Sequence, residues 1–356
     1  MLLQKHLPDA EKICKILLYS QNFFLCVFYN SFTNFLKMSI LLSDAEKMFI
    51  IHGVQDDYRS DGRARIDYRP MELETDIVNC ASGSARLRLA NTDILVGVKA
   101  EIDVPTLDKR DQGKIEFFVD CSANATPEFE GRGGEQLGTL ISNCLLRAYE
   151  SPQAFDLKQL CILPEKQCWK LFVDVLILEC GGNLFDAVSL AVKAALFNTR
   201  VPRVEAAVID GGSIDLKLSD DLFNSVRLNV GSAPLLVTMC RIGKSCVVDP
   251  SAEEEKCSPV SLVIGITGNP KYYGADAESS SVGKITTVMT HGGGSLHSTI
   301  QIKKIVSTET GLSTETESSV RALISAETKT FLDTLKIYCL LKFDLFFTLI
   351  QTVNTC

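Results

Sequence analysis

Hydrophobic and polar residues alternate with a period of two through much of the first half of the chain. This alternation is typical of strands that bury one face of a sheet. It predicts strands over residues 71–78, 85–90, 94–102, 115–121 and 169–178. The last segment is so dense in apolar residues that we expect both of its faces to be buried. Asn91-Thr92-Asp93 provides a polar turn between the second and third of these strands.

Three other segments follow the helical period. Ser43-Asp44-Ala45-Glu46 has the spacing of a capping box and predicts a helix that ends near Gly53. Apolar residues at helical spacing predict two more helices, over 137–148 and 184–195. The second of these is rich in alanine, so we expect it to pack closely against a sheet.

The second half repeats the order of strands and helix more loosely. We expect strands at 204–209, 235–241, 261–265 and 285–289, and then a long helix that begins at Ser298. We place a domain boundary near Arg203, which gives a first domain over 38–203 and a second over 204–332. The acidic run Glu253-Glu254-Glu255-Lys256 is expected to be a solvated loop.

The two ends of the chain differ from the rest. Residues 1–37 contain an interrupted apolar stretch that fits a signal peptide poorly, and Met38 offers a second start directly before the first helix. We therefore expect 1–37 to be a non-native or poorly ordered extension. The apolar tail over 333–356 carries Lys336, Lys342 and Asp344, so it is too short and too charged to span a membrane.

Composition is that of a folded protein with two ordinary domains. The 356 residues are 46% hydrophobic and 22% charged, close to the average for globular chains, which argues against disorder over the whole length. The 13 cysteines form no CxxC pair, so we expect buried, reduced thiols in the cytosol or nucleus and no metal site. The segment from His291 to His297 is expected to be a flexible turn rather than a metal or phosphate loop.

The net charge of −8 limits how the chain can act on nucleic acid. Proteins that bind RNA alone are usually basic, because Lys and Arg contact the phosphates. Any RNA contact here must come from a few local basic residues, or from a groove shared with more basic partners.

Several motifs together resemble the RNase PH family. They are Arg59-Ser60-Asp61-Gly62-Arg63, Gly83-Ser84-Ala85, Asn91-Thr92-Asp93-Ile94-Leu95-Val96, Val173-Asp174-Val175-Leu176 and Gly182-Asn183-Leu184-Phe185-Asp186-Ala187. Each motif alone is weak, but their order and spacing make a strong joint signal, and we expect the similarity to cover residues 40–330. The resemblance implies an α+β fold, in which a domain of the ribosomal protein S5 domain 2-like type precedes an RNase PH C-terminal domain.

Within this family the chain looks most similar to the ring-forming subunits of the RNA exosome. That resemblance implies a heterodimer with another RNase PH-like subunit inside a six-member ring with a central RNA channel. It also implies S1/KH cap subunits, an attached catalytic nuclease and RNA as partners, with roles in rRNA maturation and mRNA turnover in the nucleus, nucleolus and cytoplasm.

The resemblance also implies that the chemistry is missing. Active members carry Asp-Gly-Gly-Thr-Arg-Thr where a strand leads into a helix. Here Gly181 stands at the position of the catalytic Asp, Leu184 and Phe185 replace Thr and Arg, and Asp186 replaces a Thr that binds phosphate. We therefore expect no catalysis and no cofactor. Asp186 has a simpler reading, since an Asp in the first turn of a helix is favoured by the helix dipole.

Four arginines are candidate RNA contacts: Arg59, Arg63, Arg132 and Arg147. Arg59 and Arg63 have an alternative role, in which they brace the turn around Asp61 through ion pairs. In related ring subunits two arginines near the end of the first long helix face the channel; Arg147 fits one of these positions and Cys144 occupies the other. Two further functions stay open, an active phosphate-dependent 3′–5′ exoribonuclease and a scaffold that never contacts RNA.

Overall fold

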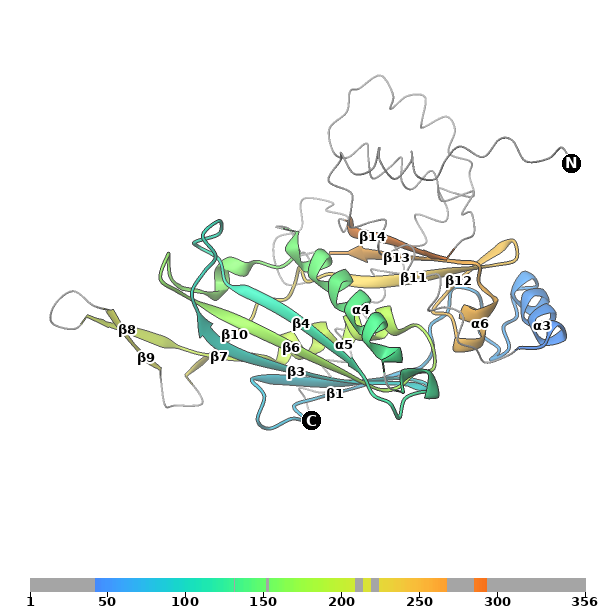
Figure 1. The fold of residues 1–356 in the computed structure, drawn as a ribbon, viewed down its shortest axis with the longest axis horizontal. Helices are drawn as coiled ribbons and strands as arrows, with labels where there is room; N and C mark the ends of the chain where they lie inside the picture. The colour runs from blue at the N-terminus through green and yellow to red at the C-terminus, as the bar shows by residue number, and fades with distance from the viewer. Residues whose placement is uncertain are drawn as a thin grey trace, which may run out of the picture.

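A computed structural model describes residues 42–130, 132–151, 154–208, 214–218, 224–267 and 285–292 of the chain. Two sheets enclose a layer of helices (Figure 1). The helix α4 (Gly133–Glu150) contacts strands of both sheets, and so does the helix α5 (Leu184–Asn198). The molecule is therefore a sheet–helix–sheet sandwich, in which the helices are covered on both sides.

The first sheet has the strand order β1-β2-β3-β6-β4. Its members are β1 (Met71–Thr75), β2 (Gly83–Leu89), β3 (Thr92–Asp103), β4 (Lys114–Cys121) and β6 (Gln167–Glu179). Only β4 runs parallel to its neighbour, β6, and the short strand β5 (Cys161–Leu163) pairs with the start of β6. All five strands predicted from alternation in the first half of the chain are confirmed.

Two details of this sheet differ from expectation. Thr92 and Asp93 belong to β3 rather than to the turn, because Thr92 pairs with Leu89 and leaves only a two-residue connection, in which Ala90 has a φ of 50°. The expectation that β6 is buried on both faces is wrong. Val173, Val175 and their inward neighbours are buried, whereas Asp174, which points to the other face, is exposed.

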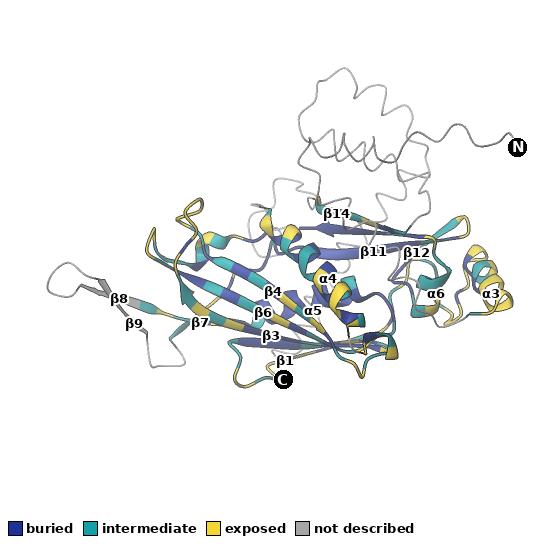
Figure 2. Ribbon diagram, in the orientation of Figure 1, coloured by how far each residue is buried: buried dark blue, intermediate teal, exposed yellow. Residues whose placement is uncertain are grey.

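The helices begin where the sequence predicts. In α3 (Asp44–Gln55), Ser43 and Glu46 form the expected capping box, although the helix buries only Ile50 and Val54. α4 and α5 cover the two segments predicted from helical spacing, and α5 is buried on nearly all sides (Figure 2). α4 approaches β4 so closely that a side chain at Gly138 would lie 2.4 Å from the Val119 carbonyl oxygen. Two short 3-10 helices, η1 (Pro127–Phe129) and η2 (Leu157–Leu160), flank α4 in the sequence.

The second sheet is antiparallel, with the order β12-β11-β13-β14. Its strands are β11 (Leu235–Ile242), β12 (Ser245–Val248), β13 (Val260–Ile266) and β14 (Ile285–Gly292). Two small ribbons connect the sheets: β7 (Arg200–Pro202) pairs with β10 (Ser225–Arg227), and β8 (Val204–Val208) pairs with β9 (Ile214–Leu218). The β8–β9 ribbon extends away from both sheets (Figure 1).

The acidic run after β12 is not a solvated loop. Residues Ala252–Cys257 form the short helix α6, which begins with a capping box between Ser251 and Glu254. Glu254 is 2% exposed. The prediction of a loop is wrong because it rested on charge alone. The spacing of Ser251 and Glu254 is that of a capping box, which predicts the start of a helix.

Several expectations fall on residues that the structure does not describe. The helix from Ser298, the extension 1–37, the tail 333–356 and His297 all lie outside the described residues. His291 itself lies in β14 and is buried. The domain boundary near Arg203 stays a prediction.

A lysine is buried inside the helix layer. Lys193 of α5 is fully buried, and its Nζ donates a hydrogen bond to the Ala233 carbonyl at 2.7 Å. Burial lowers the pKa of Lys193 well below its usual value, because an ammonium group loses its hydration there. Across the part of the chain with described structure, no helix is long and apolar enough to cross a membrane.

Candidate functional site: the junction between β6 and α5

The chain makes a sharp turn between β6 and α5, where the resemblance locates the phosphorolytic site of active relatives. Gly182 and Asn183 both have left-handed backbones, with φ of 96° and 53°. A side chain at Gly182 would lie 2.5 Å from the Ala252 nitrogen, so α6 packs directly on this turn. Thr92 fastens the turn to β3: its hydroxyl donates to the Gly182 carbonyl and accepts the Gly181 N–H.

Arg69 and Asp249 form a buried ion pair beside the turn. The Arg69 guanidinium binds both carboxylate oxygens of Asp249, at 3.0 and 3.1 Å. It also donates to the carbonyls of Gly181 and Gly182, at 2.8 and 3.0 Å. Asn183 donates its side-chain amide to Asp249 at 2.6 Å. Burial raises the pKa of Asp249, but the hydrogen bonds and charge of Arg69 and the Asn183 hydrogen bond outweigh burial and hold that pKa below its usual value.

Glu255 of α6 supplies a second carboxylate. Its Oε1 accepts the backbone N–H of Asn183 at 2.8 Å. Burial raises the pKa of Glu255 to about 7, despite this hydrogen bond and the nearby charge of Arg69. The backbone N–H of Asn183, the residue that caps the start of α5, is therefore already bound by a carboxyl group of the same chain.

Asp186 is fully buried in the first turn of α5. Its two carboxylate oxygens accept hydrogen bonds from the Tyr68 hydroxyl at 2.7 Å and the Thr238 hydroxyl at 2.8 Å. Asp186 thereby joins α5 to β11 of the second sheet. Its place in the first helical turn also agrees with the helix-dipole reading.

The two apolar replacements in the motif lie in packed surroundings. Leu184 is buried. Phe185 stacks on His291 of β14, with ring centroids 5.2 Å apart. Burial lowers the pKa of His291 to about 4, so this ring is neutral at physiological pH. The positions where active relatives carry Thr and Arg therefore hold side chains that join the core.

The expectation that Arg59 contacts RNA is wrong. Arg59 is 1% exposed, and its guanidinium pairs with Glu254 of α6. It also donates to the carbonyls of Asp67, Val248 and Asp249. Arg59 therefore braces the fold, as the alternative role predicts, although its carboxylate partner is Glu254 rather than Asp61.

Arg63 has a similar bracing position. Its Nε donates to Asp61 at 2.6 Å, and its Nη1 lies 3.1 Å from the Asp249 carboxylate. Only 12% of its side chain is exposed. Because the Asp61 and Asp249 carboxylates hold this guanidinium in place, it is poorly positioned to take up a phosphate as well.

Arg132 and Arg147 are both exposed but lie at opposite ends of α4. Fifteen residues at 1.5 Å of rise per residue separate them by about 22 Å. Arg132 precedes the first residue of α4. Cys144, at the position of the first arginine of related subunits, is 2% exposed, and burial raises its pKa to about 12. Cys144 therefore packs inward, whereas Arg147 points to the surface.

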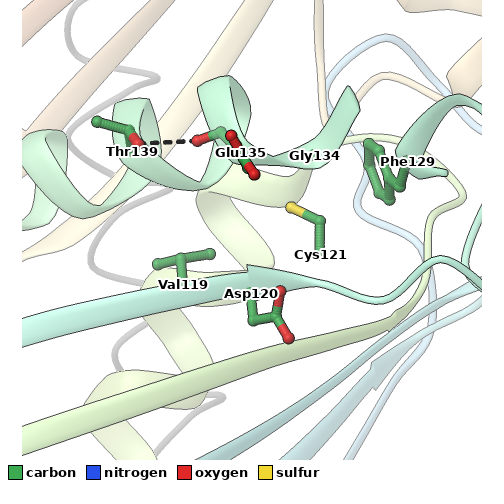
Figure 3. A pocket seen from close by; sticks show the side chains of 7 residues that line it. All are labelled: Val119, Asp120, Cys121, Phe129, Gly134, Glu135 and Thr139. Atoms are coloured by element: carbon green, nitrogen blue, oxygen red, sulfur yellow. Dashed lines mark hydrogen bonds between the residues drawn. The ribbon is translucent and has the colours of Figure 1, made fainter. Parts of the chain in front are cut away.

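A cavity of about 390 Å³ lies beside β4 and the start of α4 (Figure 3). Its lining includes the carboxylates Asp120 and Glu135 together with Cys121, and none of the four replaced motif residues borders it. Figure 3 shows Cys121 directed toward α4 and Asp120 on the other side of the strand. Within the described ranges, no three His, Cys, Asp or Glu side chains gather closely enough to hold a metal ion.

Comparison with known proteins decides the family. The model of domain 1 of the 3′ exoribonuclease family matches residues 67–202, and the model of domain 2 matches residues 232–306. The putative exosome complex exonuclease RRP42 of Dictyostelium discoideum is 35% identical over 272 residues, which cover 63% of this chain and 84% of that protein. This chain belongs to the RNase PH family.

Other RNase PH relatives agree with this assignment. The exosome complex component Rrp42 of Methanosarcina mazei is 34% identical over 228 residues, or 64% of this chain and 80% of that protein. A chain of the Archaeoglobus fulgidus exosome, solved with RNA bound to the active site, superposes with a TM-score of 0.59 at 26% identity, covering 74% of this chain and 93% of that one. The expected fold, RNase PH domain 1 followed by domain 2, is confirmed, and the chain is of the Rrp42 type.

Sequence reasoning missed the residues that hold this RNase PH junction together. Arg69, Asp249 and Glu255 were not singled out, and Glu254 was assigned to a loop. Local signals existed for two of them: the capping box at Ser251 predicts a helix that contains Glu254 and Glu255. No local signal pairs Arg69 with Asp249, because 180 residues separate them.

We expect Arg59→Met to destabilise the folded chain by about 3–5 kcal/mol, because it leaves Glu254 buried without its cation. Arg65→Met is the matched control, since Arg65 forms an exposed ion pair with Asp57 in the same loop and should cost at most about 1 kcal/mol. Urea denaturation of the two variants measures both values. Equal losses would contradict a structural role for the buried pair.

Glu255→Gln should stabilise the chain at high pH. A carboxyl whose folded-state pKa is raised costs stability above that pKa, and the cost disappears as the pH falls below the unfolded value of 4.5. We expect a gain of up to about 3 kcal/mol at pH 8 that vanishes near pH 4.5. Glu253→Gln, on the exposed side of α6, should change little at either pH. If the gain in stability from Glu255→Gln did not depend on pH, the raised pKa of Glu255 would not be its cause.

Proposed function

We propose that this chain is a ring subunit of the RNA exosome that has no phosphorolytic activity and helps to guide RNA through the central channel. Its similarity to Rrp42-type exosome components supports an RNase PH-like ring subunit. Other RNase PH-like subunits complete the ring, while S1/KH cap subunits and an attached nuclease complete the assembly. It acts in the nucleus, nucleolus and cytoplasm.

The single observation that carries the non-catalytic assignment is the closed junction before α5. A phosphate that attacks RNA needs free N–H groups, hydroxyls and a cation around it. Here the Asn183 N–H binds Glu255, and the Arg69 guanidinium is engaged by Asp249 and two carbonyls. These donors and acceptors form hydrogen bonds with each other, so they are not free to bind phosphate.

Charge at the junction also opposes phosphate. Asp186, Asp249 and Glu255 contribute three carboxyl groups around the start of α5. One negative charge at roughly 4 Å from a phosphate costs about 4 kcal/mol at an effective dielectric near 20. Arg69 and Arg63 are already paired with Asp249 and Asp61, so little positive charge is left to attract an anion.

An RNA-guiding role is supported by the two exposed arginines at the ends of α4. Neither Arg132 nor Arg147 takes part in an ion pair found among the described side chains. Since the whole chain carries a net charge of −8, these contacts must act together with basic groups of neighbouring subunits.

The purified full chain should release no nucleoside diphosphate from RNA 3′ ends in the presence of phosphate. An active RNase PH enzyme assayed in the same buffer serves as the positive control. A trace signal from contaminating nuclease would be the same for the chain and for its Glu255→Gln variant. Phosphate-dependent release that persists through stringent purification and changes with Glu255→Gln would favour the alternative, an active exoribonuclease.

Arg147→Ala and Arg132→Ala, each placed in an assembled ring, should weaken RNA binding without changing assembly. Removing one arginine–phosphate interaction should reduce the salt dependence of RNA affinity by about one unit of slope. Arg110→Ala is the control, because Arg110 is an exposed arginine that pairs with Glu165 away from α4. If neither Arg147→Ala nor Arg132→Ala changed the RNA affinity or its salt dependence, a scaffold that never contacts RNA would be favoured.

A further inference from the structure

The face of the first sheet that points away from the helices carries an ordered set of side chains. Along β4 and β6, exposed and partly exposed residues alternate with buried ones (Figure 2). Strand pairing places these outward residues in three rows, each with one residue from β3, one from β6 and one from β4. In that order, the rows are Lys99-Phe172-Glu116, Gly97-Asp174-Phe118 and Leu95-Leu176-Asp120.

Two phenyl rings form the centre of this face. Phe118 and Phe172 stack, with centroids 6.2 Å apart and planes inclined by 26°. The Lys170 ammonium lies 4.5 Å from the Phe172 ring centroid, so this ring already attracts a cation. Phe118 is 52% exposed and lies directly beside Asp174 in register. The exposed Phe118 ring, stacked on Phe172, provides apolar contact area at the centre of the face.

The charges around these rings do not balance. Each lysine of the face is paired: Lys99 with Glu101, Lys114 with Asp103 and Lys170 with Glu116. Two carboxylates beside the rings, Asp120 and Asp174, take part in no ion pair identified among the residues of known structure, and neither do Glu72 and Glu74 on β1 of the same face. The face therefore has an excess of negative charge beside the exposed ring: Asp174 lies next to Phe118 in register, Asp120 lies two residues further along β4, and the nearby Lys99 is itself bound by Glu101.

Gly97 leaves the approach to Asp174 open from the opposite side. A side chain at this position would meet only the Ala81 Cβ, at 4.0 Å, which is an ordinary van der Waals contact. Asp174 thus has a phenyl ring on one side and, on the other, a glycine that lacks a side chain of its own and has only the small Ala81 side chain nearby. A long cationic side chain can reach the carboxylate from the Gly97 side and lie against the ring.

We propose that this sheet face docks a protein segment that presents an arginine or lysine to Asp174, with the cation lying over Phe118. The pairing supplies the missing positive charge and combines a charge-assisted hydrogen bond with a cation–π contact. A central aromatic group with a rim of paired charges is also typical of the energetic centre of protein interfaces.

The same charges argue against RNA as the occupant. Phosphates would approach Asp120 and Asp174, and the lysines nearby are already held by carboxylates. The surface is separate from the junction before α5, so its role goes beyond the proposed function. A chain that enters the ring but docks nothing at Asp174 would refute only this inference, whereas a chain that enters no ring would refute the exosome assignment.

A photocrosslinker at position 97 tests the occupant. Gly97→p-benzoylphenylalanine is introduced into the full chain, which is then assembled with the other ring subunits and with RNA. We expect a crosslink to a protein peptide that contains an arginine or lysine near the crosslinked residue. A crosslink to RNA, a crosslink to a peptide without a basic residue, or no crosslink to another polymer would each overturn the proposal. The same probe at the exposed Leu107 controls for random contact.

Charge reversal tests the role of Asp174. Asp174→Arg should weaken binding of the crosslinked partner by about thirtyfold or more, as expected when one member of an interfacial charge pair is replaced. Glu253→Arg makes the same change in net charge on exposed α6 and should alter binding less than about twofold. Equal effects of the two variants would show a general charge effect and overturn the proposal.

A stability measurement, a second variant and a charge swap separate a direct contact at Asp174 from an effect on folding. Thermal unfolding should be nearly the same for Asp174→Arg and the unchanged chain, because Asp174 is exposed. If Asp174→Arg does not fold, Asp174→Asn keeps the size of the side chain and should still weaken binding measurably. Reversing the basic residue of the partner to Asp should restore part of the affinity that Asp174→Arg removes, and a failure to restore it would count against a direct contact.

Discussion

The buried carboxylate of Asp249 is the interaction on which this part of the fold depends. It lies directly after β12 in the second sheet and accepts hydrogen bonds from Arg63, Arg69 and Asn183. These donors come from the segment before β1 and from the turn before α5. Removing a charge of this kind from water is costly unless it is paired, so the three segments must come together for any of them to be stable. One carboxylate thereby joins elements of both sheets.

This arrangement gives a physical reason for our proposal that this RNase PH chain carries out no phosphorolysis. In an active site, free N–H groups and cations at the start of α5 would be kept for phosphate. Here the protein's own carboxylates occupy them: Glu255 takes the Asn183 N–H, and Asp249 takes the Arg69 guanidinium. Asp186 binds two hydroxyls and joins α5 to β11. Groups that would attract an anion instead stabilise contacts within the fold.

The two faces of the first sheet have different roles. The inward face packs on α4 and α5 and forms the main hydrophobic core together with them. The outward face has an exposed ring, an unpaired Asp174 and a glycine that leaves access to it. In our proposal the chain performs no chemistry and contributes through its surfaces, and partner recognition is concentrated at these side chains.

The sequence by itself determined the elements and the family. Period-two alternation located the strands of the first sheet, a looser repeat of that pattern located three strands of the second, the Ser43 capping box located the first helix, and the ordered motifs identified RNase PH. These signals are local, because the period of a strand or the cap of a helix is contained within a few residues. Only the tertiary structure decided that Arg59 is buried against Glu254 and that Asp249 closes the junction. Those partners lie 180 or more residues apart, and their pairing depends on the packing of whole sheets rather than on neighbouring residues.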